Sequence, residues 1–108
     1  MPSHTPALFE PIKVGDAELK HRVVLAPLTR FRATREGVLG DIAVEYYKQR
    51  ASVPGTLLIT EATYISRNAG GMANVPGSYT DAQINAWRKV QSCHVHRVHE
   101  ADHRLSRL

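Results

Sequence analysis

Two apolar runs along the chain have the length and composition of buried strands. Residues 23–29 read Val-Val-Leu-Ala-Pro-Leu-Thr, and residues 56–62 read Thr-Leu-Leu-Ile-Thr-Glu-Ala. Each is a largely aliphatic stretch without strict polar alternation, which is typical of a strand buried on both faces, as in a parallel sheet. The sequence therefore predicts two strands of this kind.

A helical pattern follows each of these runs. Asp41 is a suitable N-cap for a helix over residues 42–51. A second helix is predicted from residues 80–81 onward, where Ile84 and Trp87 recur at helical spacing. We expect Trp87 to pack that second helix onto the sheet.

The segment before the first strand has the pattern of a β-hairpin. Residues 11–14 and 18–22 bracket a Gly15-Asp16 pair, and short extended pieces around such a pair favour a tight turn. The predicted order of elements is hairpin, strand, helix, strand, helix. This alternation predicts an α/β fold with a parallel sheet.

Composition excludes several classes of protein. The 108 residues are 43% hydrophobic and 22% charged, which is too apolar for a disordered chain and fits one small domain. No apolar stretch approaches the ~18 residues of a membrane-spanning helix, so no membrane partner is expected. The N-terminus lacks the pattern of a secretory signal, which predicts a cytoplasmic protein. The single cysteine, Cys93, excludes an internal disulfide.

The last fifth of the chain differs from the rest. Net charge is +4, and residues 88–108 hold five lysines and arginines against two acidic residues, together with four of the six histidines. Because this segment lacks interleaved aromatic residues, it does not predict a nucleic-acid partner. Residues 91–108 are expected to form a basic, poorly ordered tail.

This tail also holds side chains that can bind metal ions, namely Cys93, His94, His96, His99 and His103. His99 and His103 lie four residues apart, which would place them on one face of a helix. No second cysteine pair or established zinc-finger spacing accompanies them. The sequence therefore predicts no specific metal site.

Candidate chemistry lies where the two predicted strands end. In α/β folds, ligands bind beyond the carboxyl ends of the strands, here residues 26–29 and 60–63. Each segment has a small residue, a hydroxyl and backbone amides that can meet the edge of a flat polar heterocycle. Thr29 and Thr60 have an alternative role, which is to satisfy local backbone groups. Glu61 is either a base or the structural partner of a neighbouring arginine.

Several blocks between residues 8 and 90 resemble the old yellow enzyme family of flavin oxidoreductases. In order, they are residues 8–15, 19–24, 26–33, 45–51, 54–62, 70–71 and 75–77. Ala62, where yeast-type members carry glycine, favours a fungal member of the family. The resemblance implies an FMN-containing (β/α)₈ TIM barrel, which takes hydride from NADPH and passes it to an activated C=C bond, typically in an enone-type small molecule.

The resemblance also implies where this chain belongs in the barrel. Residues 1–90 would be its N-terminal part, with a hairpin at the bottom followed by two of the eight βα units. The Thr29 hydroxyl would bond the O4 edge of the flavin, and the backbone amide of Ala62 would face the ring. The implied cofactor-binding residues are Ala26, Pro27, Leu28, Thr29 and Ala62.

The same resemblance implies that further functional residues of the family would lie beyond residue 108. The substrate-binding pair and the proton-donating tyrosine of the family would follow residue 108, so no catalytic residue is assigned. Beyond Val90 the sequence departs from the family's third strand, which suggests a frameshift, a mis-spliced transcript or a faulty gene model. We therefore expect weak or no FMN binding by the isolated chain, self-association or aggregation through uncovered apolar faces, and no NADPH turnover. The alternative to an oxidoreductase is an inactive, truncated pseudo-reductase.

Overall fold

The computed structural model describes residues 4–92, and strands alternate with helices from residue 24 onward. This order confirms the predicted α/β class. The elements are η1 (Ala7–Phe9), β1 (Ile12–Val14), β2 (Ala17–Leu19), β3 (Val24–Leu25), α1 (Asp41–Arg50), β4 (Leu57–Leu58), η2 (Arg67–Ala69) and α2 (Asp81–Ser92), where η marks a short 3₁₀ helix.

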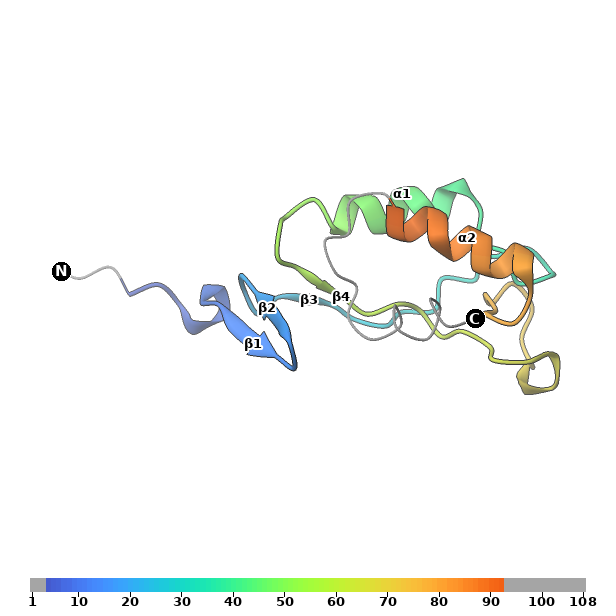
Figure 1. Cartoon of the computed structure of the whole chain (residues 1–108), viewed down its shortest axis with the longest axis horizontal. Coiled ribbons are helices and arrows are strands. Elements are labelled where there is room, and N and C mark those ends of the chain that lie inside the picture. The colour runs from blue at the N-terminus through green and yellow to red at the C-terminus, as the bar shows by residue number, and fades with distance from the viewer. Residues whose placement is uncertain (1–3, 93–108) are drawn as a thin grey trace.

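Strands β1 and β2 form the antiparallel hairpin that the sequence predicts. Val14 pairs with Ala17, which leaves a two-residue turn that begins at Gly15. Gly15 has a φ of 57°, a conformation that glycine adopts without steric cost at the first central position of such a turn. The hairpin lies beside the start of β3 (Figure 1), and Lys20 N–H donates to the Gly55 carbonyl at 3.2 Å.

His21 fastens the hairpin to the segment that leads into β4. Its Nε2 lies 2.7 Å from Thr56 Oγ1, and the Thr56 hydroxyl donates to the Val53 carbonyl, also at 2.7 Å. Because the hydroxyl hydrogen is used there, His21 Nε2 acts as a donor. Its Nδ1 accepts from Val23 N–H at 3.1 Å, so these contacts define one tautomer of the imidazole.

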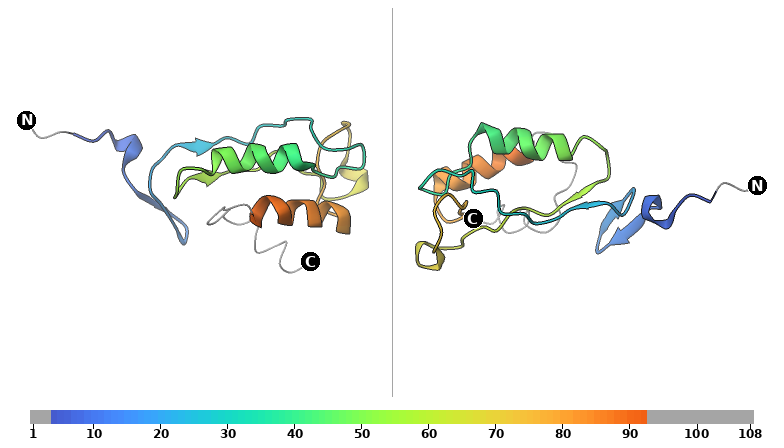
Figure 2. Two further views of the ribbon diagram at one scale, coloured as in Figure 1. Left: turned by 90° about the horizontal axis from the view of Figure 1, so that it is seen from above. Right: turned by 180° about the vertical axis from the view of Figure 1, so that it is seen from behind.

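Strands β3 and β4 pair in parallel, and both helices cover one face of the pair. Val24 lies opposite Leu57, and Leu25 lies opposite Leu58. Figures 1 and 2 show α1 and α2 side by side on the same side of the strands. The result is a two-layer unit, with one layer of helices on a two-stranded parallel sheet.

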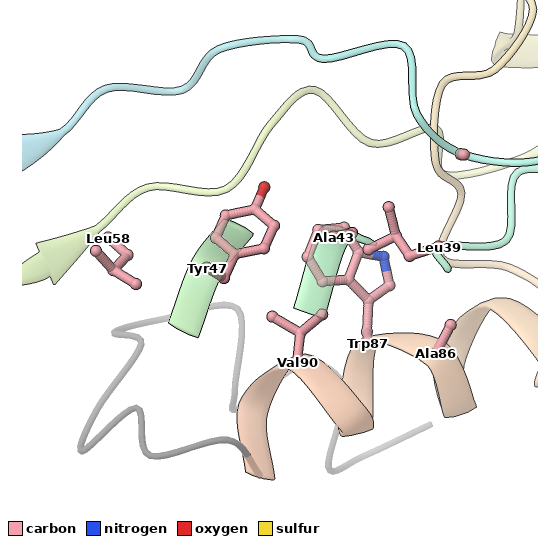
Figure 3. Packing of buried hydrophobic residues seen from close by; sticks show 8 residues of the cluster. Leu39, Ala43, Tyr47, Leu58, Ala86, Trp87 and Val90 are labelled. Atoms are coloured by element: carbon pink, nitrogen blue, oxygen red, sulfur yellow. The ribbon is translucent and has the colours of Figure 1, made fainter. Parts of the chain in front are cut away.

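The core lies between the helices and this pair of strands. Tyr47 of α1, Trp87 and Val90 of α2, and Leu58 of β4 are buried in one cluster (Figure 3). The ring centroids of Tyr47 and Trp87 are 6.0 Å apart, within the range of favourable aromatic pairs. Trp87 Nε1 donates to the Gly77 carbonyl at 3.2 Å. These contacts pack α2 against α1 and the loop at Gly77, and the packing of Trp87 onto the sheet itself stays a prediction.

The opposite face of the strand pair has no cover among residues 4–92. Val24 is 37% exposed and Ile59 is 43% exposed, whereas Leu25 and Leu58 pack against the helix layer. The prediction of strands buried on both faces is therefore wrong for this structure. Side chains of a strand alternate between its two faces, and only one face carries helices here.

Both helices begin within one residue of the predicted positions. α1 begins at Asp41 with Gly40 as its N-cap, so the prediction of Asp41 as the cap is wrong by one residue. α2 begins at Asp81, directly after Thr80. Thr80 Oγ1 accepts from Gln83 N–H at 3.2 Å, while Gln83 Oε1 accepts from Thr80 N–H at 3.0 Å. This reciprocal pair is a capping box, which satisfies donors at the helix start.

Gln83 also ties the loops that follow β3 and β4 to the start of α2. Its side chain is 1% exposed. Its Nε2 donates to the Glu36 carbonyl at 2.8 Å, and its Oε1 accepts a second bond, from Tyr79 N–H at 3.0 Å. Space around the amide is small, because a Cβ placed on Gly77 would lie 2.6 Å from its atoms.

Two further expectations concern membranes and metals. Within residues 4–92, no helix has the length and apolar character needed to cross a membrane. The same residues hold no cluster of three or more metal-ligating side chains. The tail ligands considered above, from Cys93 to His103, and most of the predicted tail lie outside the described residues.

Substitution of Gly77 by alanine tests the tight packing around Gln83. We expect Gly77→Ala to lower the free energy of unfolding by about 1–3 kcal/mol, because Gln83 cannot retreat without breaking hydrogen bonds. Urea unfolding followed by the fluorescence of Trp87, the single tryptophan, measures the change. Gly71→Ala is the matched control, since nothing lies within 4 Å of a Cβ at that position. Equal losses in the two variants would contradict the expectation.

Candidate functional site

The carboxyl ends of β3 and β4 open onto one edge of the sheet. Because the strands are parallel, residues 26–29 and 60–63 follow them in the same direction, toward the end where such folds bind ligands. Ile59 N–H donates to the Leu25 carbonyl at 3.1 Å and extends the ladder by one step. The structure therefore brings the two sequence-predicted segments to the same edge.

The five sequence-predicted cofactor residues are accessible at this edge. Four of them, Ala26, Pro27, Leu28 and Ala62, are exposed, and Thr29 is half-buried. Among residues 4–92, no hydrogen bond engages the Thr29 hydroxyl. The alternative in which Thr29 satisfies a local backbone group thus has no support from the described contacts.

A buried carboxylate, that of Glu61, lies directly behind this edge. Glu61 is 4% exposed. Its Oε1 accepts from the Tyr47 hydroxyl at 3.1 Å, and its Oε2 accepts from Arg30 N–H at 3.4 Å. The Tyr47 oxygen in turn accepts from Glu61 N–H at 3.1 Å. Tyr47 and Glu61 therefore exchange two hydrogen bonds, one through the side chain and one through the backbone.

These hydrogen bonds distinguish between the two roles considered for Glu61. Of the base and the structural partner of an arginine, the geometry favours the structural partner, but the contact is to the backbone N–H of Arg30. The guanidinium of Arg30 lies instead over the ring of Tyr46, 5.5 Å from the centroid. Arg50, which belongs to α1 like Tyr46, stacks on the same ring at 3.8 Å. The cation–π contact of Arg30 with Tyr46 holds the loop after β3 against α1.

Phe31 follows this anchored arginine and has an unusual backbone. Its φ is 55°, which is rare for a residue with a bulky side chain, and its side chain is 49% exposed. Two residues later, Ala33 N–H donates to the Asn74 carbonyl at 3.3 Å. This bond joins the loop after β3 to the loop that follows β4. No pattern in the sequence marks Phe31 as a position of positive φ.

A hollow of about 780 Å³ lies between the loops that follow β3 and β4. Its lining includes two cationic side chains, Arg35 and Arg67, and the side chains of Tyr64, Met72 and Gln83. The five sequence-predicted cofactor residues do not line it. The hollow and the exposed edge are therefore separate features of the same end of the sheet.

The arrangement defines an α/β protein with an accessible edge at the carboxyl ends of its parallel strands. The chain matches the NADH:flavin oxidoreductase / NADH oxidase family over residues 7–103, and it belongs to that family. The family binds FMN and uses NAD(P)H. The fold corresponds to the N-terminal quarter of old yellow enzyme TIM barrels, so the resemblance and the fold predicted from the sequence are confirmed.

Individual relatives agree with this assignment. The chain is 60% identical over 83 residues to an NADP-dependent oxidoreductase, lnbE, of Aspergillus flavus, which covers 77% of this chain and 22% of the relative. It is 54% identical over 86 residues to a probable inactive reductase, easA, of Epichloe festucae var. lolii, which covers 80% of this chain and 23% of the relative. The crystal structure of Old Yellow Enzyme from a Pichia species superimposes with a TM-score of 0.77 at 49% identity, over 81% of this chain and 22% of that one. The chain thus spans less than a quarter of the length of these proteins.

The buried hydroxyl of Tyr47 gives a pH-dependent stability. Burial raises the pKa of Tyr47 above its ordinary value; the hydrogen bond from Glu61 N–H offsets part of this rise, and the charge of the Glu61 side chain adds to it. Because the folded-state pKa exceeds the unfolded value of about 10, the contribution of this group to stability is complete below about pH 10. It is lost as the pH rises toward the folded-state value.

We therefore expect the urea midpoint of the chain to fall as the pH rises from about 10 to about 11.5, and to fall less in Tyr47→Phe, which has no hydroxyl to ionise at this position. Tyrosinate absorbance gives a second measurement, since burial raises the pKa of Tyr47 above the ordinary value of a tyrosine. A parallel decline in the two proteins would contradict the assignment of this titration to Tyr47.

Proposed function

We propose that this chain forms part of the FMN site of an NAD(P)H-dependent oxidoreductase that reduces activated C=C bonds in small, enone-type molecules. The observation that carries the proposal is the exposed edge made by residues 26–29 and Ala62 at the carboxyl ends of two adjacent parallel strands. Membership of the NADH:flavin oxidoreductase family supports it. When bound, FMN supplies the hydride chemistry, and the residues of this edge hold and orient its ring.

The side chains at this edge fit a flat, polar ring. Ala26 and Ala62 are small and exposed, so the edge of a ring can approach the backbone closely. Leu28 is 48% exposed and offers an apolar contact next to Pro27. The Thr29 hydroxyl can donate a hydrogen bond at the mouth of the site, and such a donor stabilises negative charge on a reduced ring.

A second candidate is a chain that binds flavin without catalysing a reaction. The similarity to a probable inactive reductase at 54% identity favours keeping this alternative. Anaerobic addition of NADPH to the chain with FMN separates the two. Loss of the flavin absorbance near 450 nm supports the oxidoreductase, whereas a saturable FMN complex that NADPH does not bleach supports the inactive alternative.

Titration with FMN tests the proposed site directly. We expect weak but saturable quenching of flavin fluorescence by the chain, and Thr29→Val should weaken binding about threefold to tenfold, because it removes one hydrogen bond and keeps the shape of the side chain. Thr5→Val removes an exposed hydroxyl far from the edge in sequence and serves as the matched control. A chain that binds no FMN at any concentration would refute the proposed function. Equal affinities for all three proteins would refute the role of Thr29.

A further inference from the structure

The two segments of the proposed flavin edge are held by one buried carboxylate. Glu61 immediately precedes Ala62 in the chain, and its Oε2 accepts from the backbone N–H of Arg30, which immediately follows Thr29. A single side chain therefore connects the neighbours of two proposed flavin contacts, one on each strand end. Movement of Glu61 would change the spacing between Thr29 and Ala62.

Tyr47 fixes the place of this carboxylate. The phenol belongs to α1 and is 2% exposed, with its ring packed against Trp87. Its oxygen accepts from Glu61 N–H and donates to Glu61 Oε1, at 3.1 Å in both cases. Since both bonds reach one residue from one phenol, neither the backbone nor the side chain of Glu61 can shift without breaking one of them.

Stability alone does not explain why an acidic residue occupies position 61. Burial of a carboxylate is costly unless it is well hydrogen-bonded, and well-packed apolar residues often replace buried polar groups without loss of stability. Within residues 4–92, the hydrogen bonds of this carboxylate come from two neutral donors, the Tyr47 hydroxyl and the Arg30 amide. The Arg30 amide lies at the end of the proposed flavin segment, so the acid serves the geometry of that segment.

We propose that Tyr47 and Glu61 are positioning residues for the flavin, which set the distance between the Thr29 segment and the Ala62 amide by hydrogen bonds to the backbone on both sides. This inference rests on the proposed function. Tyr47 belongs to a packed helix, an element on which a binding geometry is held more precisely than on a loop. Glu61 lies three residues after β4 and takes its place from its bonds to Tyr47. Neither residue needs to touch the flavin.

Three variants of the whole chain test the inference. Tyr47→Phe removes both hydroxyl contacts and keeps the packed ring. Tyr47→Phe combined with Glu61→Met also removes the buried acid that has lost its phenol donor, which should recover stability relative to the single variant. Tyr64→Phe is the matched control, because the Tyr64 hydroxyl accepts from Met72 N–H at 2.9 Å, outside the two segments.

Two measurements are made on each protein that remains folded. FMN affinity is determined by fluorescence titration, and amide hydrogen exchange is followed by NMR, with attention to the N–H groups of Arg30 and Glu61. We expect Tyr47→Phe to weaken FMN binding about threefold to tenfold and to accelerate exchange at these two amides. The double variant should regain stability but not FMN affinity, and Tyr64→Phe should change neither FMN affinity nor exchange at these amides.

The outcomes separate this inference from the proposed function. FMN binding that Tyr47→Phe leaves unchanged overturns the inference alone. FMN affinity that follows the free energy of unfolding across all variants also overturns it, since the pair would then act only through stability. Fast hydrogen exchange at the Arg30 and Glu61 amides of the unsubstituted chain would show that these amides are not held in hydrogen bonds to Glu61 and Tyr47, which also overturns the inference. A chain that binds no FMN refutes the proposed function, and the flavin role of Tyr47 and Glu61 with it.

Discussion

The buried hydroxyl of Tyr47 is the point at which the helix layer, the sheet and the candidate site meet. Its ring contributes to the core beside Trp87, while its oxygen exchanges two hydrogen bonds with Glu61. Without these bonds, one oxygen of the Glu61 carboxylate and a backbone amide would be left buried and unpaired, which is among the more costly defects in a protein interior. Because Glu61 also binds Arg30, the helix, the end of β4 and the loop after β3 are constrained together.

The second constraint on the structure is that helices cover only one face of the sheet. The helices bury Leu58 and cover part of Leu25, and the alternate positions Val24 and Ile59 remain at the other face. In a (β/α)₈ barrel the helices form the outer ring, and the strand side chains that point away from them fill the interior. The exposed aliphatic side chains of this chain are of the branched type that such interiors contain. The two-layer unit therefore has the side-chain pattern of a barrel segment.

Local patterns in the sequence predict most of the regular structure. The Gly15 turn follows from glycine conformation and the start of α2 from its capping box, both of which act over a few positions. The two strands lie within the predicted runs 23–29 and 56–62 but span only Val24–Leu25 and Leu57–Leu58. The inference of burial on both faces assumed cover that one helix layer does not provide. Gln83 could have been found from the sequence, because a threonine three residues before a glutamine is the pattern of a capping box.

The contacts of the candidate site were harder to predict, because they join residues far apart in the chain. Tyr47 and Glu61 are separated by 14 positions, and Arg30 and Glu61 by 31. A charged pair was the natural expectation for an acid near an arginine, yet Arg30 uses its backbone N–H for Glu61 and its side chain for Tyr46. Sequence identifies such partners by type, whereas the path of the loop decides which group of each residue makes the contact.

The loops that follow β3 and β4 remain connected beyond the sheet. Hydrogen bonds join them in order along the chain. They connect Leu25 with Ile59, Arg30 with Glu61, Ala33 with Asn74, and Gly37 with Gly77, the last at 3.0 Å. Each is a backbone donor on one loop that meets an acceptor on the other. The exposed edge lies near the first of these contacts, and the hollow lined by Gly37 and Gly77 lies at the last. The distance between the exposed edge and the hollow is consequently set by this series of hydrogen bonds. The second bond of the series, from Arg30 N–H to Glu61, depends on a single buried carboxylate.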